Sequence, residues 1–283
     1  MNREAIVGVD LGATKVTAGR VEGNRVAEHV TSEISAGDLE ARVLDQLIRA
    51  VEKVFLPSVA GIGVGVPSLV DVEKGIVYNV QNIPSWREVP LKKILEGRFK
   101  RPVLVNNDAN CFAVGEKHFG KGKKFRNLVG LTIGSGLGAG IIVDDRLYCG
   151  SNCGAGEFGS VPYRDSILEH YCSGQFFSRA HGMRGSELYE KARRGEEAAL
   201  EIFREFGGHM GEAVMIVMFA IDPDAIILGG SVSRAFSFFE EAMRRKLKAF
   251  PYPHAVQKLV IEKSDEPQMA ILGAAALFIN ARA

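Results

Sequence analysis

Short apolar runs that end at glycines alternate along this chain with longer segments whose apolar positions recur at helical spacing. The run at 5–11 predicts a buried strand, and the runs at 16–22 and 25–31 around Gly23-Asn24 predict a hairpin beside it. Apolar side chains at 39, 43, 47, 51 and 54 predict a helix with Asp38 as its N-cap. Strands that alternate with helices indicate an α/β protein.

The alternation continues to the end of the chain. Strands are expected at 62–66, 102–105, 128–133, 140–143, 225–228 and 258–263. Helices are expected at about 109–120, 166–181, 186–194, 197–221, 234–250 and 269–280.

One internal similarity indicates that the chain has two related halves. Val7-Gly8-Val9-Asp10-Leu11-Gly12 aligns with Val129-Gly130-Leu131-Thr132-Ile133-Gly134, and each run opens a strand pattern that ends at a glycine turn. The separation of about 120 residues is far longer than a solenoid repeat. The alternative is that two apolar strands ended in glycine independently.

Length, charge and cysteine content narrow the function classes. A chain of 283 residues exceeds one average domain, so two domains are expected. Its 35 Lys and Arg against 34 Asp and Glu argue against nucleic acid or a membrane as main partner, and Lys121–Arg126 is interpreted as a solvated loop. No apolar run has membrane-spanning length, and residues 1–4 lead straight into a strand rather than a signal peptide. Four scattered cysteines predict free thiols in a reducing cytoplasm.

The first glycine turn, Asp10 to Lys15, has groups suited to phosphate. Gly12 lets backbone N–H groups approach phosphate oxygens, while Thr14 adds a hydroxyl and Lys15 a cation. Asp10 ends the strand and is the candidate for holding Mg²⁺ through water. The turn matches neither the P-loop nor the dinucleotide fingerprint, so alone it is a weak signal.

Two further glycine turns lie in the second half. Thr132 to Gly140 carries four alternating glycines, and Thr132, Gly134, Ser135 and Gly136 could form a second anion-binding concavity rather than only a tight hairpin. Gly229-Gly230 lies between an apolar strand and a helix, where a nucleoside could pack on bare backbone. A plain strand–helix turn is the alternative there.

Carboxylates and amides in two segments are candidates for catalysis and sugar binding. Asp108 follows a strand at a predicted helix start, so it either caps that helix or accepts a proton from an attacking hydroxyl. Glu157 lies in the glycine-rich loop 154–159, and Glu169 lies on the first turn of the next predicted helix. Two such carboxylates suit neighbouring sugar hydroxyls.

With these residues in place, the chain resembles the ROK family of sugar kinases and sugar-responsive regulators, in the actin-like ATPase superfamily. The resemblance runs nearly end to end and rests on the order and spacing of modest motifs. These are Asp10–Lys15, Gly65-Val66-Pro67-Ser68 with Val70-Asp71, Asn82–Trp86, Asn107–Asn110 followed by Gly115-Glu116, Thr132–Gly140, Gly156–Gly159 and Leu168-Glu169.

The resemblance implies a role for each matching residue. It makes Asp108 the general base toward a sugar hydroxyl, and it assigns the sugar to Gly65, Asn82, Asn107, Glu157 and Glu169. It assigns Mg²⁺ to Asp10. It assigns ATP to Asp10, Gly12, Thr14, Lys15, Thr132, Gly134, Ser135, Gly136, Gly229 and Gly230.

The resemblance also implies an architecture and a setting. The expected fold is a two-lobed, ribonuclease-H-like α/β structure with duplicated mixed-sheet domains around a central cleft. The expected lobes are residues 1–112, joined by a C-terminal helix at 269–283, and residues 113–268. A cytoplasmic homodimer that acts on a hexose or hexosamine is expected.

The chain departs from the family at the sugar side. Ser160 stands where the family commonly has His, and residues 161–168 lack the Cys and His of its zinc loop. No zinc site is therefore predicted. The departure leaves room for a non-catalytic sugar or nucleotide sensor, and an actin-like ATPase that acts on another protein is a third reading. Retention of Asp108 favours the kinase.

Overall fold

The computed structural model describes residues 4–281, which divide into two compact units. Unit 1 comprises the residues up to 124, 140–155 and those from 265 onward, and unit 2 comprises 125–139 and 156–264. The lobe boundaries expected from the sequence stay a prediction. No helix among the described residues is long and apolar enough to cross a membrane.

Unit 1 is built on a five-stranded sheet of order β3-β2-β1-β4-β8. The strands are β1 Ala5–Leu11, β2 Lys15–Glu22, β3 Arg25–Glu33, β4 Val59–Val66 and β8 Val103–Asn107. Its helices are α1 Glu40–Val54, α2 Leu91–Phe99, α3 Asp108–His118 and α10 Met269–Asn280. A small sheet is formed by β5 Leu69–Asp71, β6 Ile76–Tyr78 and β7 Glu88–Val89.

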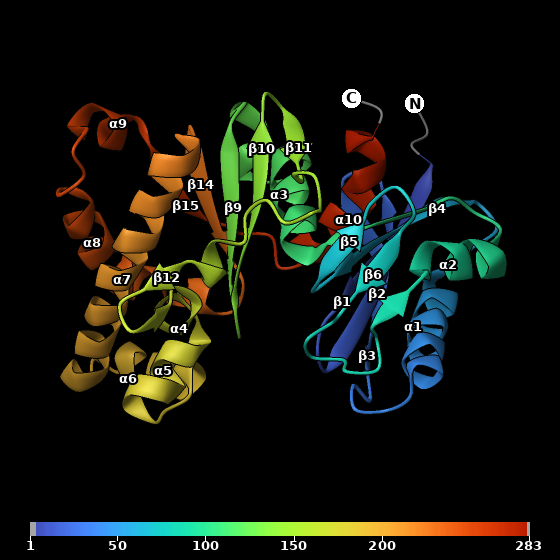
Figure 1. Ribbon diagram of the computed structural model, residues 1–283, viewed down its shortest axis with the longest axis horizontal. Helices are drawn as coiled ribbons and strands as arrows, with labels where there is room; N and C mark the ends of the chain where they lie inside the picture. The colour runs from blue at the N-terminus through green and yellow to red at the C-terminus, as the bar shows by residue number, and fades with distance from the viewer. Residues whose placement is uncertain (1–3, 282–283) are drawn as a thin grey trace. The chain divides into compact units, whose positions relative to one another are not determined.

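The two faces of this sheet differ because side chains alternate along each strand. On one face Val7, Val9 and their neighbours pack with the buried side of α1 in one hydrophobic core. On the other face β1 and β4 present glycines to α10, which lies close to both strands (Figure 1). A Cβ on Gly8 would lie 2.1 Å from the carbonyl oxygen of Ile271, and one on Gly63 would lie 1.9 Å from that of Ala274. These glycines therefore set how closely α10 approaches the sheet.

The second five-stranded sheet has the order β11-β10-β9-β14-β15. Its strands are β9 Leu128–Ile133, β10 Leu137–Val143, β11 Arg146–Tyr148, β14 Ala225–Gly229 and β15 Val260–Lys263. The chain also forms β12 Pro162–Tyr163, β13 Ser166–Ile167, α4 Glu169–Cys172, α5 Gly174–His181, α6 Gly185–Arg193, α7 Glu197–Ile221, α8 Phe236–Leu247 and α9 Pro253–Lys258. Short 3₁₀ turns lie at Lys121–Lys124, Phe158–Ser160 and Val232–Ala235.

The two large sheets share one strand plan. In each, three consecutive strands lie side by side in reverse order, and two later strands continue the sheet beyond the first of them. Strands β4 and β8 pair in parallel in the first sheet, as β14 and β15 do in the second. This agreement supports the two related halves that the internal similarity indicated.

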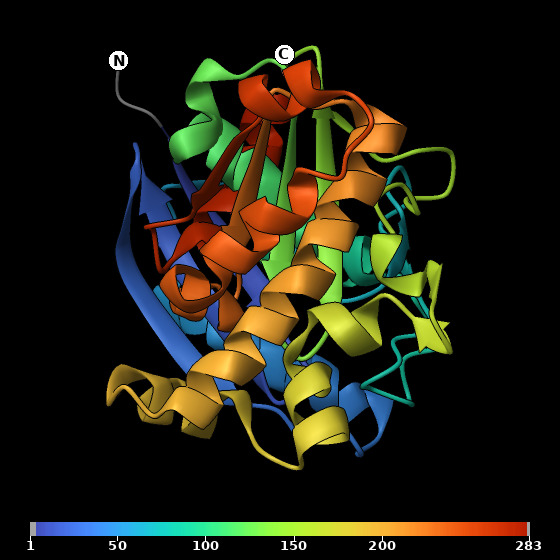
Figure 2. The ribbon, with the colours of Figure 1, turned by 90° about the vertical axis from the view of Figure 1, so that its left-hand side faces the viewer.

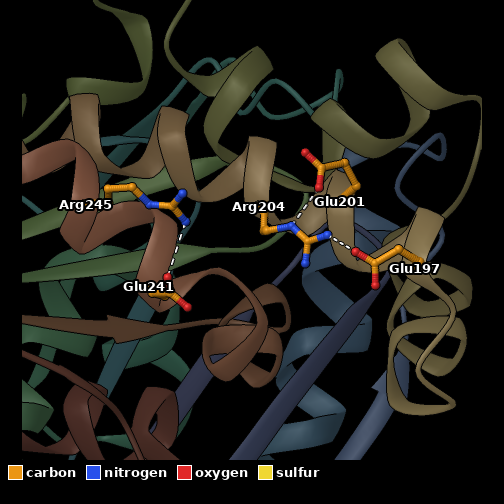
Figure 3. Close-up of polar contacts among 5 residues, drawn as sticks. All are labelled: Glu197, Glu201, Arg204, Glu241 and Arg245. Atoms are coloured by element: carbon orange, nitrogen blue, oxygen red, sulfur yellow. Dashed lines mark hydrogen bonds and ion pairs between the residues drawn. The ribbon is translucent and has the colours of Figure 1, made fainter.

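Helices α7 and α8 pack closely, as Figure 2 shows. A Cβ on Gly207 would lie 2.4 Å from the carbonyl oxygen of Phe239, so the close approach depends on that glycine. On the outer side of α7, Arg204 pairs with Glu197 and, at 2.7 Å, with Glu201 (Figure 3). Exposed pairs of this kind contribute at most about 1 kcal/mol each.

Most predicted elements are present, and three predictions were wrong in detail. The helix after residue 38 begins at Glu40 with Leu39 as N-cap, and Asp38 instead forms an ion pair with Arg42 at 3.1 Å. The helix expected at 166–181 is divided into strand β13 and helices α4 and α5. The helix expected at 234–250 begins as a 3₁₀ turn and becomes α-helical only at Phe236.

Candidate functional site

Three parallel strands of unit 1 end beside one another and carry the first group of candidate residues. Asp10 on β1 pairs in register with Gly65 on β4, and Gly65 pairs with Asn106 on β8. Neighbouring strands lie about 4.8 Å apart, so these positions form one short row across the sheet. The apolar runs that precede them are buried, which fixes the row at the strand ends.

The chain passes directly from this row into α3. Asn107 is the N-cap, and its side-chain oxygen accepts hydrogen bonds from the backbone N–H groups of Ala109 at 2.9 Å and Asn110 at 3.3 Å. Asp108 is the first residue of the helix, and its Oδ1 accepts from the Ala109 N–H at 2.8 Å. Because Asn107 caps the helix, the alternative in which Asp108 only caps it was wrong.

Gly65 of the strand row lies close to the start of α3. A Cβ at Gly65 would lie 3.4 Å from the Cα of Asp108 and 3.2 Å from the sulfur of Cys111. Glycine therefore keeps bare backbone beside the start of α3. The side-chain Nδ2 group of Asn107 donates to the backbone carbonyl of Ser68 at 3.3 Å, which holds the segment after β4 near the start of α3.

The first glycine turn lies between β1 and β2. The Gly12 N–H donates to the carbonyl of Lys15 at 2.9 Å, and the side chains of Thr14 and Lys15 are exposed. Burial raises the pKa of Asp10 above its ordinary value of 3.8, and the nearby charge of Lys15 opposes part of that shift. A carboxylate that has lost much of its water is suited to a cation, so Asp10 fits a magnesium ion.

The raised pKa of Asp10 predicts a pH-dependent stability. The folded state holds this proton more firmly than the unfolded state, so the stability from this group is present below pH 3.8 and is lost as pH rises through the folded pKa. We expect Asp10→Asn to raise the free energy of unfolding at neutral pH, with a gain that shrinks as pH falls towards 3.8. Urea titrations of the ligand-free protein at several pH values measure this.

Asp71 offers a control of opposite sign. Hydrogen bonds from Lys74 lower its pKa, so its contribution is present above pH 3.8 and is lost on acidification. Asp71→Asn should therefore lower the free energy of unfolding at neutral pH. If both variants shifted stability in the same direction, burial would not be the cause at Asp10.

Asn82 is not part of the strand row, because it lies outside β1, β4 and β8. It is exposed in the turn between β6 and β7, next to the buried side chains Ile83 and Trp86. Backbone hydrogen bonds from Ile83 to Val80, at 3.0 Å, and from Trp86 to Ile83, at 2.9 Å, shape this turn. The two buried side chains anchor the turn and leave the Asn82 amide open to a ligand.

In unit 2, the second glycine turn contacts one of the two candidate sugar carboxylates. Glu169 begins α4, and its Oε2 accepts from the Leu137 backbone N–H at 2.9 Å. A Cβ on Gly136 would lie 2.6 Å from the same oxygen, so glycine makes room for the carboxylate. The turn itself is closed by a hydrogen bond from the Gly134 N–H to the Gly136 carbonyl at 3.0 Å.

Gln175 joins this carboxylate to the turn, and sequence reasoning missed it. Its Nε2 group donates to Glu169 Oε1 at 2.9 Å and to the Ser135 carbonyl at 3.1 Å. The residue lies at the start of α5, whose first N–H, from Gly174, donates to Gly134 at 2.7 Å. No sequence motif marks Gln175. The sequence shows only that it follows Glu169 by six residues within the expected helix.

Glu157 is exposed and precedes the 3₁₀ turn Phe158–Ser160. Loss of water around its carboxylate raises the pKa of Glu157, and the neighbouring charge of Glu169 adds to the shift. The two carboxylates therefore interact electrostatically, as expected of a pair that would share one polyol. A bound sugar hydroxyl or a proton would relieve their repulsion.

The third glycine turn follows β14. Gly229 pairs with Thr132 in register, which places the end of β14 beside the end of β9. Gly230 has φ +82°, and a Cβ there would lie 2.4 Å from the Ile133 carbonyl oxygen. Both the backbone conformation and the space therefore require glycine at this position.

Within the described range 4–281, no group of three or more His, Cys, Asp or Glu side chains is arranged to hold a metal ion. The absence of a zinc site, as inferred from the sequence, stays a prediction. Chemically, unit 1 offers a carboxylate at a helix start beside bare backbone. Unit 2 offers a carboxylate pair and two glycine turns. Such groups suit a hydroxyl acceptor and a phosphate donor.

Known proteins resemble this chain along most of its length. The ROK family profile matches residues 6–281. A glucokinase from Streptomyces coelicolor is 31% identical over 278 residues, which cover 86% of each chain. A xylose repressor from Caldicellulosiruptor bescii is 27% identical, with 98% of this chain and 78% of the repressor covered. The crystal structure of a ROK family glucokinase from Streptomyces griseus with glucose and AMPPNP matches with a TM-score of 0.83 at 28% identity, over 96% of this chain and 98% of that one.

Proposed function

Because this chain belongs to the ROK family, with its actin-like fold, we propose that it is a sugar kinase that transfers the γ-phosphoryl group of ATP to a hydroxyl of a hexose or hexosamine. The observation that carries the proposal is the placement of Asp108. It starts α3, directly after the end of β8, which pairs with β4 at Gly65, and Gly65 in turn pairs with Asp10 on β1. The glucose and AMPPNP bound by the Streptomyces griseus glucokinase support both substrate classes.

In this proposal Asp108 is the general base. Its carboxylate accepts the proton of the sugar hydroxyl as that oxygen attacks the γ-phosphorus, and ADP leaves from the opposite side. The Asn107 cap and the first turn of α3 hold the carboxylate in place, which limits the reorganisation needed during the reaction.

The remaining predicted residues bind and orient the two substrates. Gly65, Asn82, Asn107, Glu157 and Glu169 are assigned to the sugar. Gly12, Thr14 and Lys15 with Thr132, Gly134, Ser135 and Gly136 are assigned to the phosphates, and Gly229 and Gly230 to the nucleoside. Asp10 would hold Mg²⁺, which when bound neutralises charge on the phosphate oxygens. A homodimer in the cytoplasm completes the proposal.

Sugar-dependent release of ADP tests this function. We would supply Mg-ATP with glucose, mannose, fructose, allose and the N-acetylhexosamines in turn, and expect turnover that depends on one or a few of these sugars. Nucleotide hydrolysis that is independent of sugar would instead support an ATPase.

The xylose repressor match supports a second candidate, a sugar sensor without catalysis. A sensor would bind sugar or nucleotide, as measured by a shift of the melting temperature, and would release no ADP with any sugar. Retention of Asp108 at the start of α3 favours the kinase, because a protein that only binds sugar has no need of a base.

A further inference from the structure

Two cysteines in unit 1 lie next to the segment that carries Asp108. Cys149 and Cys153 follow β11, and both are free thiols. Their sulfurs hydrogen bond to each other. The Nδ2 group of Asn110 lies 3.7 Å from the sulfur of Cys149 and 3.6 Å from that of Cys153, so one amide contacts both.

The sulfur of Cys153 is surrounded by hydrogen-bond donors. The backbone N–H groups of Asn107 and Val70, the Asn110 amide and the Cys149 thiol all donate to it. Such donors stabilise a thiolate, and the hydrogen bond from Cys149 lowers the pKa of Cys153 more than any of the others. Together they lower the pKa of Cys153 to about 7, whereas the same hydrogen bond raises the pKa of Cys149. The pair therefore gives up its first proton easily and keeps its second.

The other two cysteines have the opposite character. Cys111 and Cys172 are buried, and burial raises the pKa of each thiol. A protonated, buried thiol reacts slowly. Cys149 is partly exposed, while Cys153 is 3% exposed, so an oxidant would meet the pair at Cys149.

We propose that Cys149 and Cys153 form a reversible intrachain disulfide, a modification site beside the start of α3. The oxidant is a low-molecular-weight disulfide. The Cys153 thiolate accepts the proton of the Cys149 thiol as the exposed Cys149 sulfur attacks one sulfur of the oxidant, and one thiolate is released. Cys153 passes that proton to the released thiolate and attacks the Cys149 sulfur of the mixed disulfide, and a second thiolate leaves. The second thiolate takes a proton from solvent, so the oxidant is reduced to two thiols.

The backbone suits this exchange. Cys153 has φ +57°, a left-handed conformation that is uncommon for a residue other than glycine, and Gly150 has φ +69°. These two residues turn the loop back so that two sulfurs four positions apart meet. A bond between them closes a very short ring, which costs little further loop entropy because the ends are already together.

The bond would change the contacts of the catalytic segment, a consequence that rests on the proposed function. In the reduced protein Cys153, when protonated, donates to Asn106 Oδ1 at 3.4 Å, and the same oxygen accepts from the Asn107 N–H at 2.8 Å. A disulfide has no hydrogen to donate and is a poorer acceptor than a thiolate. We therefore expect the segment before Asp108 to shift and kcat for sugar to fall several-fold on oxidation, with full recovery after dithiothreitol.

Intact-mass measurement of the whole chain tests the site directly. After incubation with glutathione disulfide, the wild-type protein should lose the mass of two hydrogen atoms, and peptide mapping should join Cys149 to Cys153. Cys149→Ser and Cys153→Ser should each prevent this loss, with a retained glutathione adduct expected in Cys153→Ser. Cys172→Ala, which removes a buried thiol of unit 2, should behave as wild type.

Several outcomes would overturn the proposal. These are a wild-type chain that keeps its mass under oxidation, a bond that maps to Cys111, or a mass loss that persists in both serine variants. Parallel ADP assays separate this site from the function. If the mapped bond forms but the reduced protein shows no sugar-dependent turnover, the proposed kinase function is wrong and the proposed disulfide is supported.

Discussion

Asp108→Asn is expected to lower kcat for the preferred sugar by about 10²- to 10⁴-fold, the contribution of a positioned general base. Asparagine keeps the size of the side chain and an oxygen that can accept from the Ala109 N–H, which lies 2.8 Å from Oδ1 in the native protein. It has no carboxylate to take the hydroxyl proton. The fold and substrate binding should therefore persist while the chemical step slows. ADP release at saturating sugar and Mg-ATP measures the change.

Asp38→Asn is the matched control for this prediction. Asp38 lies on unit 1 as well, but its side chain forms an ion pair with Arg42 and is assigned no role in catalysis or substrate binding. Its substitution should leave kcat unchanged. A wild-type kcat in Asp108→Asn, with sugar-dependent turnover intact, would remove Asp108 from the chemistry and require another base.

The sequence predicted the strand ends well because local chemistry determines them. An apolar strand that stops at a glycine or a polar side chain has few alternatives, so Asp10 could be placed at a strand end and Asp108 at a helix start from the sequence alone, whereas Gly65 was assigned only through the family resemblance. Their arrangement as one row needed the register of β1, β4 and β8, which no local pattern contains. The glycines of β1 and β4 carried a further signal, since alternate glycines on a strand indicate a close approach by another element.

The segment 166–181 shows why other parts of the fold and of the candidate site could not be predicted from the sequence. Its apolar spacing predicted one helix, yet Ser173 is extended, with φ −134° and ψ −175°, and begins a new helix. The following N–H, from Gly174, donates to the Gly134 carbonyl at 2.7 Å, a contact between residues 40 positions apart in sequence. That long-range contact overrides the local periodicity. The break between α4 and α5 also places Gln175 beside Glu169. Because the sequence did not predict this break, it did not predict Gln175 as a residue of the site.

Gly273→Ala is expected to destabilise the protein by about 3 kcal/mol, at the upper end of overpacking costs. Gly273 lies in α10, where a Cβ would be 1.9 Å from the carbonyl oxygen of Cys111 on α3 and 3.3 Å from the Gly115 nitrogen. Both neighbours are backbone, so no side chain can rotate away and one helix has to move. Because α3 starts at Asp108, we expect the variant to lose activity along with stability.

Gly208→Ala separates this packing effect from helix propensity. Gly208 is also inside a helix, α7, but a Cβ there would have no atom within 4 Å. Alanine should therefore stabilise the protein by about 0.5–1 kcal/mol, since it reduces the conformational entropy of the unfolded chain relative to glycine. Urea unfolding followed by circular dichroism should show midpoints that move in opposite directions for the two variants. Equal shifts would mean that α10 does not rest on α3 as closely as the carbonyl contact requires.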